Sequence, residues 1–495
     1  MAIDLSRSEY DLLIGGERVP SASGERFATF NPATNQVMAQ VAKAGPEDVD
    51  RAVEAARSAF EGDWARVSAP RRNQLLMRLA ALMWEEFDDL AELETHNNGK
   101  ALSSVKGELK QAIGELEFFA GAATKISGDT LSAPYGFLNY TVREPVGVCA
   151  MIVPWNYPIL LAMRKLAPAL AAGNTAVLKP ATATPLTALV LGDLALEAGI
   201  PPGTVNVVTG PGEEMGSYLV RHPGVDKVSF TGETATGREI MRAAANDIKR
   251  VSLELGGTSP NLGFEDADLE TAAANSVWAI FTSAGQSCEA RSRLFVQESV
   301  HDDFLDLFVD KTKKLVVGDP MDEATQIGSL ISPQHRDRVA GYVEAGVKEG
   351  AKLAMGGTAP DDGDLQEGNY YLPTVLSDVE NRFRVAQEEI FGPVVTVTRF
   401  REEADAVRMA NDVIYGLAAT LWTGDVARAH RVAGQIQSGV VTVNTPFTVF
   451  PGLPFGGYKQ SGLGREVAME ALKEYTELKS VIVYTREKPF NPFGV

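Results

Sequence analysis

Hydrophobic residues in the first quarter of the chain recur every three or four positions, which is the spacing of an amphipathic helix. This pattern predicts helices over residues 48–60, 71–97 and 101–121, the first of them opening with acidic residues. Residues 10–40 contain Gly, Pro and short β-rich stretches instead. We therefore expect this early segment to be an entry arm rather than part of a core.

From about residue 146 the pattern changes to short apolar runs, each ending in Gly, Pro or Asn and each followed by a helical stretch. These runs cover residues 146–153, 175–178, 205–208, 227–230 and 251–255. Strands that alternate with helices in this way predict a parallel, doubly wound α/β sheet. Because such sheets bind ligands beyond the carboxyl ends of their strands, this region is typical of a nucleotide-binding domain.

A second alternating region runs from residue 270 to about 460, with strands expected at residues 293–296, 394–398 and 440–444. Two further alternating segments, 137–144 and 479–484, lie outside both series. Edge strands of this kind can pair with each other or extend the sheet of another subunit.

The composition is that of a globular protein, since 45% of the 495 residues are hydrophobic and 22% are charged. Sixty-five acidic against 46 basic residues give a formal charge of −19, which argues against nucleic acid or an anionic membrane as a partner. Polar residues and prolines interrupt the most apolar stretch, residues 147–178, so we do not expect it to span a bilayer. With only two cysteines and no apolar signal core at the N-terminus, we expect a cytoplasmic protein without disulfides.

The strongest chemical signal is Gly285-Gln286-Ser287-Cys288, in which Cys288 lies 34 residues after the Glu254 of Glu254-Leu255-Gly256-Gly257. A thiolate adds readily to a carbonyl carbon, and a carboxylate can then activate water against the acyl-enzyme. The other cysteine, Cys149, lies within an apolar run, where a small buried thiol is ordinary. Cys288 and Glu254 are therefore the candidate nucleophile and general base.

Groups at the ends of the expected strands suit a dinucleotide. Residues 230–237 place two glycines at a turn that opens a helix, where backbone N–H groups can hold a pyrophosphate; a purely structural turn is the alternative. Lys179 can reach a ribose or phosphate oxygen, or can simply be solvated. Asn156, which follows Pro154-Trp155, can donate to an oxyanion or can close a turn.

In their order along the chain, these motifs resemble those of the NAD(P)-dependent aldehyde dehydrogenases, and the resemblance runs from about residue 10 to 485. The motifs are Pro-Trp-Asn at 154–156, Leu-Lys-Pro at 178–180, Phe-Thr-Gly at 230–232, Glu-Leu-Gly-Gly at 254–257, Gly-Gln-Ser-Cys at 285–288, Glu-Ile-Phe-Gly-Pro at 389–393 and Pro-Phe-Gly-Gly-Tyr-Lys at 454–459. The resemblance implies an α/β fold with a Rossmann-like cofactor domain, an α/β catalytic domain and a β-strand oligomerisation arm.

The same resemblance implies domain boundaries. The cofactor domain would comprise residues 1–126 and 146–256, the catalytic domain residues 257–460, and the arm residues 127–145 and 475–490. The arm implies a homodimer or homotetramer.

On matching positions the resemblance implies a hydrolytic, non-acylating mechanism. Cys288 would form a thiohemiacetal and then a thioester, and Glu254 would activate the water that hydrolyses it. Asn156 and the Cys288 N–H would form the oxyanion hole, Glu466 would help to relay protons, and no metal is implied. Lys179 and Glu389 would hold the two riboses of the cofactor, with Phe391 beside its nicotinamide. The other cofactor positions would be Ile152, Val153, Trp155, Asn156, Thr182, Gly210, Gly212, Gly216, Gly232, Gly237 and Leu255.

Two positions depart from the commonest pattern of the family. Thr182 stands where NAD-preferring members usually carry a glutamate that repels a 2′-phosphate, so we expect either NAD or NADP to be accepted. Glu233 stands where a serine commonly meets the pyrophosphate, so we do not count its side chain as a phosphate ligand.

The substrate tunnel implied by the resemblance is mainly aromatic and apolar, which favours a hydrophobic or aromatic aldehyde. Arg164 resembles the arginine with which semialdehyde dehydrogenases hold a substrate carboxylate, but Thr282 replaces the second arginine expected there. A semialdehyde dehydrogenase is therefore the alternative. The tunnel positions are Tyr157, Leu160, Leu161, Arg164, Thr282, Phe447, Val449 and Phe455.

Other classes of protein explain the motifs less well. A relative that passes the thioester to coenzyme A would commonly lack the carboxylate of Glu254. A non-catalytic protein on the same fold would have no reason to keep Cys288, Glu254 and Asn156 together, and a cysteine hydrolase would leave the dinucleotide motifs unexplained.

Overall fold

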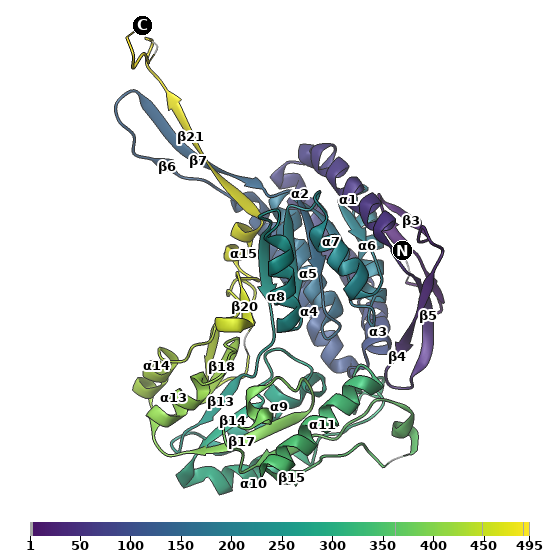
Figure 1. Cartoon of the computed structure of the whole chain (residues 1–495), viewed down its shortest axis with the longest axis vertical. Helices are drawn as coiled ribbons and strands as arrows, with labels where there is room; N and C mark the ends of the chain where they lie inside the picture. Colours follow the sequence, from purple (N-terminus) through teal and green to yellow (C-terminus); the bar gives the residue numbers. More distant parts are fainter. Residues whose placement is uncertain (1–2, 362, 448, 489, 495) are drawn as a thin grey trace.

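The computed structural model describes residues 3–361, 363–447, 449–488 and 490–494. In Figure 1 the N-terminal half of the chain forms the upper body, the green C-terminal part forms the lower body, and a narrow β-sheet projects from the top. Met1, Ala2, Asp362, Thr448 and Pro489, which fall within the predicted domain ranges, lie outside the described residues.

The strands predicted between residues 146 and 255 form the parallel centre of the sheet in the upper body, as expected. They are β8 (Val148–Ile152), β9 (Thr175–Lys179), β10 (Val205–Val207), β11 (Lys227–Thr231) and β12 (Arg250–Glu254), in the sheet order β12-β11-β8-β9-β10. The register sets Ile152 beside Lys179 and Thr231 beside Glu254. The carboxyl ends of these strands therefore meet at one edge, where the candidate residues follow them.

The prediction that residues 10–40 form only an entry arm is wrong. Leu12 and Leu13 are completely buried. The strand that contains them, β2 (Leu12–Ile14), pairs antiparallel with β10 and with β3 (Glu17–Val19), so the segment extends the sheet core. The run is too short for its apolar pattern to stand out from the neighbouring Gly and polar residues. The sheet's other edge is β20 (Gly462–Leu463), and a separate small sheet contains β1 (Glu9–Tyr10), β5 (Gln36–Ala42) and β4 (Arg26–Asn31).

Helices cover both faces of this sheet because successive strand residues point to opposite sides. Cys149 and Met151 pack into one apolar layer, and Val148 and Ala150 into the other. The first layer contains α2 (Ala69–Glu85), α3 (Phe87–Asn98), α4 (Leu102–Ala122), α5 (Pro158–Ala172) and α6 (Leu186–Glu197). The second contains α1 (Pro46–Glu61), α7 (Ser217–Arg221) and α8 (Thr234–Ala244).

The helix predicted over residues 71–97 is two helices in the structure. The chain leaves the helical conformation at Glu86 (φ −100°, ψ 21°), between α2 and α3. This turn allows Phe87 to stack on Trp84 with ring centroids 5.3 Å apart. The apolar period continues on both sides of the break, so the sequence pattern did not reveal it.

The lower body contains a second α/β sheet, in the order β15-β16-β17-β14-β13-β18-β19. The strands predicted near 293, 394 and 440 are confirmed as β14, β17 and β19. The strands of this sheet are β13 (Pro260–Gly263), β14 (Arg293–Gln297), β15 (Lys352–Met355), β16 (Thr374–Ser377), β17 (Val394–Phe400), β18 (Ala418–Trp422) and β19 (Val440–Val443). Its helices are α9 (Leu269–Phe281), α10 (His301–Thr312), α11 (Pro333–Glu349), α12 (Arg384–Gln387), α13 (Glu403–Asn411) and α14 (Val426–Ala433).

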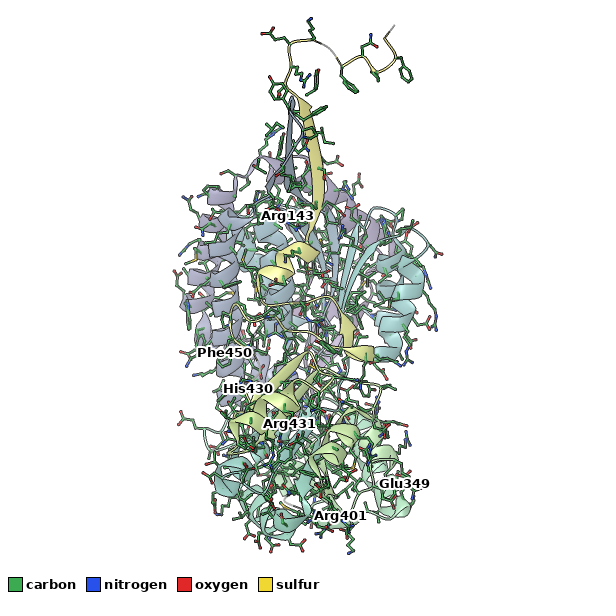
Figure 2. All side chains as sticks on the ribbon, turned by 90° about the vertical axis from the view of Figure 1, so that its left-hand side faces the viewer. Arg143, Glu349, Arg401, His430, Arg431 and Phe450 are labelled. Carbon is green, nitrogen blue, oxygen red and sulfur yellow. The ribbon has the colours of Figure 1, made fainter. Side chains whose placement is uncertain are left out.

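The projecting strands are the two segments that lay outside both αβ series, and the prediction that they pair with each other is confirmed. β7 (Phe137–Pro145) pairs antiparallel with β21 (Thr476–Tyr484), which follows α15 (Met469–Glu474), and with the short β6 (Thr130–Leu131). Arg143, at the base of the projection in Figure 2, donates to Thr476 Oγ1 at 3.1 Å. None of the helices in the described residues is both long and apolar enough to cross a membrane.

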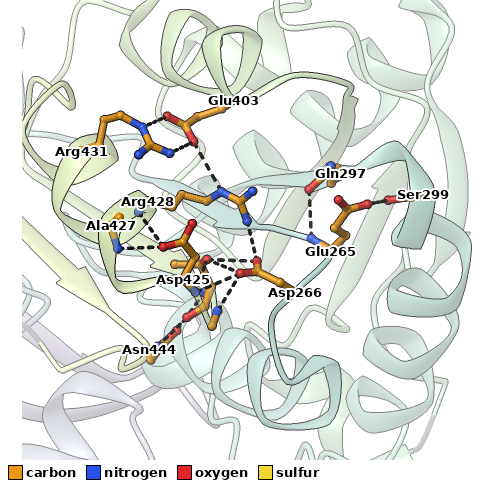
Figure 3. A network of polar contacts seen from close by, with 12 residues as sticks. Glu265, Asp266, Gln297, Ser299, Glu403, Asp425, Ala427, Arg428, Arg431 and Asn444 are labelled. Atoms are coloured by element: carbon orange, nitrogen blue, oxygen red, sulfur yellow. Dashed lines mark hydrogen bonds and ion pairs between the residues drawn. The ribbon is translucent and has the colours of Figure 1, made fainter.

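A polar network joins β18 to the loop after β13 (Figure 3). The Asp266 carboxylate accepts hydrogen bonds from Thr423 Oγ1 and from the Asp425 N–H, both at 2.9 Å, and from Arg428 Nη1 at 2.7 Å. Asp425 in turn caps α14, because its carboxylate accepts from the N–H of Ala427 at 2.8 Å. The start of α14 therefore depends on the Asp425 carboxylate.

We expect Asp425→Ala to reduce the local stability of α14 by about 0.5–2 kcal/mol, the usual cost of losing an N-cap. Native-state hydrogen exchange of the α14 amides would measure this as faster opening. Glu323→Ala, which changes an exposed side chain far from α14 in sequence, is the control. Equal α14 exchange rates in the two variants would contradict the capping role.

Candidate active site

The residues singled out at the strand ends line a cavity of about 380 Å³ between the two bodies. Cys288, Glu254 and Asn156 all contribute to its wall, although they come from three distant segments. Other predicted positions on the same wall are Trp155, Gly232, Leu255, Glu389 and Phe391. The structure thus brings the candidate nucleophile, base and oxyanion donor to one cavity.

The loop before Cys288 has an unusual backbone. Ser283, Ala284 and Gly285 all have positive φ, of 52°, 54° and 71°. A Cβ on Gly285 would lie 2.1 Å from the carbonyl oxygen of Gly392, so only glycine fits there. The Gln286 side chain then holds the loop, since its Oε1 accepts from the N–H of Ile331 at 3.0 Å. This explains the Gly-Gln pair of the motif.

Asn156 is attached directly to the same loop. Its Nδ2 donates to the carbonyl oxygen of Gln286 at 2.9 Å, and the side chain is buried. An amide nitrogen carries two hydrogens, so a second N–H remains for another acceptor. The hydrogen bond fixes the Asn156 amide beside Cys288, as an oxyanion donor requires.

The two glycines after Glu254 leave room for the neighbouring segments. A Cβ on Gly256 would lie 2.2 Å from Glu389 Oε2, and one on Gly257 would lie 2.5 Å from the carbonyl oxygen of Cys288. Glu389 also accepts from the Gly257 N–H at 2.8 Å, and burial raises the pKa of its carboxyl to about 7. The backbone after Glu254 therefore contacts both the Glu389 side chain and the backbone of the Cys288 loop.

Glu254 is buried, and within the described residues neither carboxylate oxygen has a hydrogen-bond partner. Burial, and then the negative charge of Glu466, raise the pKa of its carboxyl well above the usual range, whereas Lys165 lowers it. Lys165 Nζ lies 2.7 Å from Glu466 Oε1, and both side chains are buried. The sequence reasoning named Glu466 but missed Lys165. The sequence did contain a signal for it: Lys165 lies within the apolar run of α5, where a charged side chain needs a buried partner.

Most of the charges around the Cys288 thiol oppose its ionisation. Burial raises its pKa well above the usual range, and the carboxylates of Glu289, Glu389 and Glu254 raise it further. Of the nearby cations, Arg164 lowers it. The protein alone therefore favours the neutral thiol.

A second cavity, of about 590 Å³, lies at the same edge of the sheet. Its wall includes Ile152, Lys179, Gly212 and Gly216 among the predicted cofactor positions. Lys179 is buried, which lowers the pKa of its ammonium to about 8.

The remaining predicted cofactor positions have structural contacts. Thr182 Oγ1 donates to the carbonyl oxygen of Gly210 at 3.0 Å, and the Val153 N–H donates to the carbonyl oxygen of Lys179 at 3.1 Å. A Cβ on Gly237 would lie 2.6 Å from the Leu255 side chain, so helix packing explains this glycine.

Side chains at the N-terminus of α11 complete the wall of the first cavity, and the sequence reasoning missed them. His335 Nε2 donates to the carbonyl oxygen of Phe391 at 2.7 Å, and its ring lies 5.3 Å from that of Trp155. Phe391 has a φ of 60°, which this hydrogen bond helps to hold. The sequence around these residues shows only that a helix begins at Ser332-Pro333, which does not indicate that its first turn lines a cavity. The missed residues are Ile331, Ser332, Gln334, His335 and Arg338.

Two of the predicted tunnel residues lie near Cys288. Phe455 belongs to an apolar cluster against which both Val449 and Cys288 pack. Tyr157 precedes α5, which carries Leu160 and Leu161. The ring of Phe447 lies 5.2 Å from that of Trp278, which precedes Thr282 by one helical turn.

Arg164, considered above as a residue that could hold a substrate carboxylate, is paired with a carboxylate of the protein itself. It forms a bidentate ion pair with Glu115 on α4, with N–O distances of 2.8 and 3.1 Å, and both side chains are buried. Its guanidinium also lies 5.3 Å from the centre of the Phe455 ring. Because Glu115 already neutralises Arg164, the geometry does not favour binding of a substrate carboxylate there.

Comparison with known proteins places these features in one family. A model of the aldehyde dehydrogenase family matches residues 19–481. The chain belongs to the aldehyde dehydrogenase family. It is 43% identical over 485 residues to a betaine aldehyde dehydrogenase of Bacillus subtilis, covering 98% of this chain and 99% of that protein. The predicted family and enzyme class, an oxidoreductase acting on aldehydes, are confirmed.

Solved aldehyde dehydrogenases share the fold. The Staphylococcus aureus betaine aldehyde dehydrogenase in complex with NAD⁺ has a TM-score of 0.97 at 40% identity, covering 99% of this chain and 98% of that chain. The NAD⁺ complex of a Bacillus cereus aldehyde dehydrogenase has a TM-score of 0.95 at 43% identity, covering 97% and 98%. The predicted aldehyde dehydrogenase fold is confirmed.

Glu115→Gln should leave the Arg164 guanidinium buried without its counter-charge and so lower the free energy of unfolding by about 3–5 kcal/mol. The double variant Glu115→Gln/Arg164→Met should recover most of this loss, because it removes both charges. Urea unfolding of the wild type, both single variants and the double variant would measure the coupling. If the losses of unfolding free energy in the two single variants simply add up in the double variant, Arg164 and Glu115 are not energetically coupled.

Proposed function

We propose that this aldehyde dehydrogenase oxidises its substrate to the carboxylic acid with NAD⁺ or NADP⁺, through a thioester on Cys288 that water hydrolyses. The observation that carries the proposal is the meeting of Cys288, Glu254 and Asn156 in one cavity at the ends of a parallel sheet. The presence of Glu254 disfavours transfer of the thioester to coenzyme A.

The residues at the two cavities fit a dinucleotide. Gly232 stands on the wall beside Cys288, where it presents bare backbone, and Gly212 and Lys179 stand on the wall of the second cavity. Lys179 and Glu389 would hold the two riboses, and Phe391 would pack beside the nicotinamide. The related structures named above contain NAD⁺, which supports this assignment. When bound, the nicotinamide supplies the hydride acceptor.

Each protein group then has a defined task. Cys288 Sγ forms a bond to the aldehyde carbon, and the free N–H of Asn156 with the Cys288 N–H donates to the oxygen that gains negative charge. After hydride loss the carbon is a thioester. Glu254 takes a proton from water as the water oxygen bonds to that carbon, and the C–S bond breaks to release the acid. The Glu466–Lys165 pair lies beside Glu254 and can accept the proton next.

The domain roles follow the same reasoning. We infer that residues 1–126 and 146–256 bind the cofactor, that 257–460 supply Cys288, and that 127–145 with 475–490 join subunits into a dimer or tetramer. The projection of β7 and β21 beyond the body in Figure 1 supports the last inference. Leu478 and Ile482 on β21 are exposed apolar residues that a second subunit could cover.

The decisive test mixes the protein, NAD⁺ and butanal and follows the absorbance of the reduced cofactor with and without coenzyme A. We expect reduction that coenzyme A does not accelerate, background activity in Cys288→Ser, and a rate about 10²–10³-fold lower in Asn156→Ala. Glu254→Gln should give one turnover of reduced cofactor and then stall, because hydrolysis of the thioester lacks its base.

The pH dependence gives this test a second readout. Glu254 must be deprotonated to act, and its raised pKa means that thioester hydrolysis should increase with pH through that pKa. Glu254→Gln should lose this dependence. No cofactor reduction across a broad panel of aldehydes would overturn the proposed function, and a requirement for coenzyme A would turn it into an acylating enzyme.

We also propose that NADP⁺ is accepted, since Thr182 places no carboxylate beside a 2′-phosphate. The values of kcat/KM for NAD⁺ and NADP⁺ should lie within about tenfold of each other, and Thr182→Glu should select against NADP⁺. A conservative Thr182→Ser variant is the control and should keep the wild-type ratio. A hundredfold preference of the wild type for NAD⁺ would refute the idea.

A further inference from the structure

The C-terminal end of α3 carries a group of buried polar side chains that the proposed mechanism does not use. This group, called here the α3 cluster, consists of Glu94, Asn97, Asn98 and Lys100, and each of them is at most 2% exposed. Burial of amides and charges costs free energy unless they have partners. The partners of the α3 cluster therefore indicate what it does.

Asn98 holds the peptide bond that leads into Asn156. Residues 154–157 have no regular secondary structure, so their orientation depends on contacts from other elements. Asn98 Nδ2 donates to the carbonyl oxygen of Trp155, which belongs to the planar Trp155–Asn156 peptide bond. Within the described residues Asn98 Oδ1 has no hydrogen-bond partner, so the amide is buried for this one bond. The bond fixes the plane from which the Asn156 side chain leaves the backbone.

The chain just after Asn156 is held by the same cluster. Glu94 accepts a hydrogen bond from the N–H of Ile159 at 3.2 Å. Ile159 lies in the first turn of α5, where the N–H groups need acceptors and the Tyr157 side chain does not cap them. Lys100 Nζ lies 4.4 Å from the centre of the Tyr157 ring. Both sides of Asn156 are thus fixed from the end of α3.

The α3 cluster also reaches the loop that carries Cys288. Lys100 forms a buried ion pair with Glu108 on α4, and Glu108 Oε1 lies 3.5 Å from Ser283 Oγ. Ser283 is the first of the residues with positive φ before Cys288. The two proposed oxyanion donors, the Asn156 amide and the Cys288 N–H, therefore come from segments that both meet this cluster.

We propose that Asn98 is a positioning residue of the oxyanion hole, and that it sets the direction of the Asn156 amide through the Trp155 carbonyl. This inference rests on the proposed function, because it takes the Asn156 amide as the oxyanion donor. Asn98 is not among the residues that line the cavity beside Cys288. It can still control the rate, since misplacement of a reacting group by about 1 Å can cost about 10²-fold.

The test uses two reagents that modify Cys288 without a cofactor. With p-nitrophenyl acetate, the thiolate bonds to the carbonyl carbon, negative charge develops on the carbonyl oxygen, and p-nitrophenolate leaves. With methyl methanethiosulfonate, the thiolate bonds to sulfur and methanesulfinate leaves, so no oxyanion forms. Both reactions need the thiolate, and the ratio of acylation to thiolation rates therefore reports the oxyanion hole. Cys149 is fully buried, so one thiol per folded chain should react.

Asn98→Ala should lower this ratio by about tenfold or more, and Asn156→Ala by about 10²–10³-fold. The double variant should lose no more than Asn156→Ala alone, because Asn98 acts through Asn156. Asn97→Ala is the matched control. It removes a neighbouring buried amide that donates to the carbonyl oxygen of Ala183 instead, and it should keep the wild-type ratio.

Asn98→Asp provides a second variant of the same size, whose carboxylate accepts hydrogen bonds and does not donate them, and it should show the same loss. A second reactive thiol would identify a variant that has lost its fold. An unchanged ratio in Asn98→Ala, or losses that add in the double variant, would overturn the positioning role even if aldehydes are oxidised. A lowered ratio in a protein that oxidises no aldehyde would overturn the proposed function and leave the positioning role. A wild-type ratio in Asn156→Ala would overturn both the oxyanion hole and the role of Asn98 in it.

Discussion

The active site depends on backbone segments that approach one another too closely for any side chain between them. Gly257 lies against the carbonyl of Cys288, Gly285 lies against that of Gly392, and Gly256 makes room for Glu389. These contacts bring the end of a strand of the upper sheet, the Cys288 loop and the Glu389 segment of the lower body to a common point. A side chain at Gly257 would push the end of the upper strand away from the Cys288 loop, and one at Gly285 would push that loop away from the Gly392 segment. The glycines of the motifs are therefore as essential to the geometry as the thiol and the carboxylate.

The electrostatics of the site oppose its chemistry until ligands arrive. Burial and neighbouring carboxylates raise the pKa of the Cys288 thiol, and burial with the charge of Glu466 raises that of the Glu254 carboxyl. Both groups are needed in their deprotonated forms. Positive charge that enters the site would lower both pKa values. The Lys165–Glu466 pair places one cation and one carboxylate near Glu254, and the Glu466 carboxylate can accept the proton that Glu254 releases.

The sequence predicted the parallel strands and the residues at their ends because both follow from local patterns: apolar runs at a regular interval, and glycines where the chain must turn. It did not predict the partner of Arg164, because Glu115 lies on another helix and no local spacing links the two. His335 was missed for the same reason, since its role arises only from contact with Phe391 and Trp155. The burial of Leu12 and Leu13 was missed because a strand of three residues is too short to show an apolar pattern of its own. Contacts between residues far apart in the sequence escaped the local patterns, whereas the periodicity predicted the strands and the strand-end residues that line one cavity.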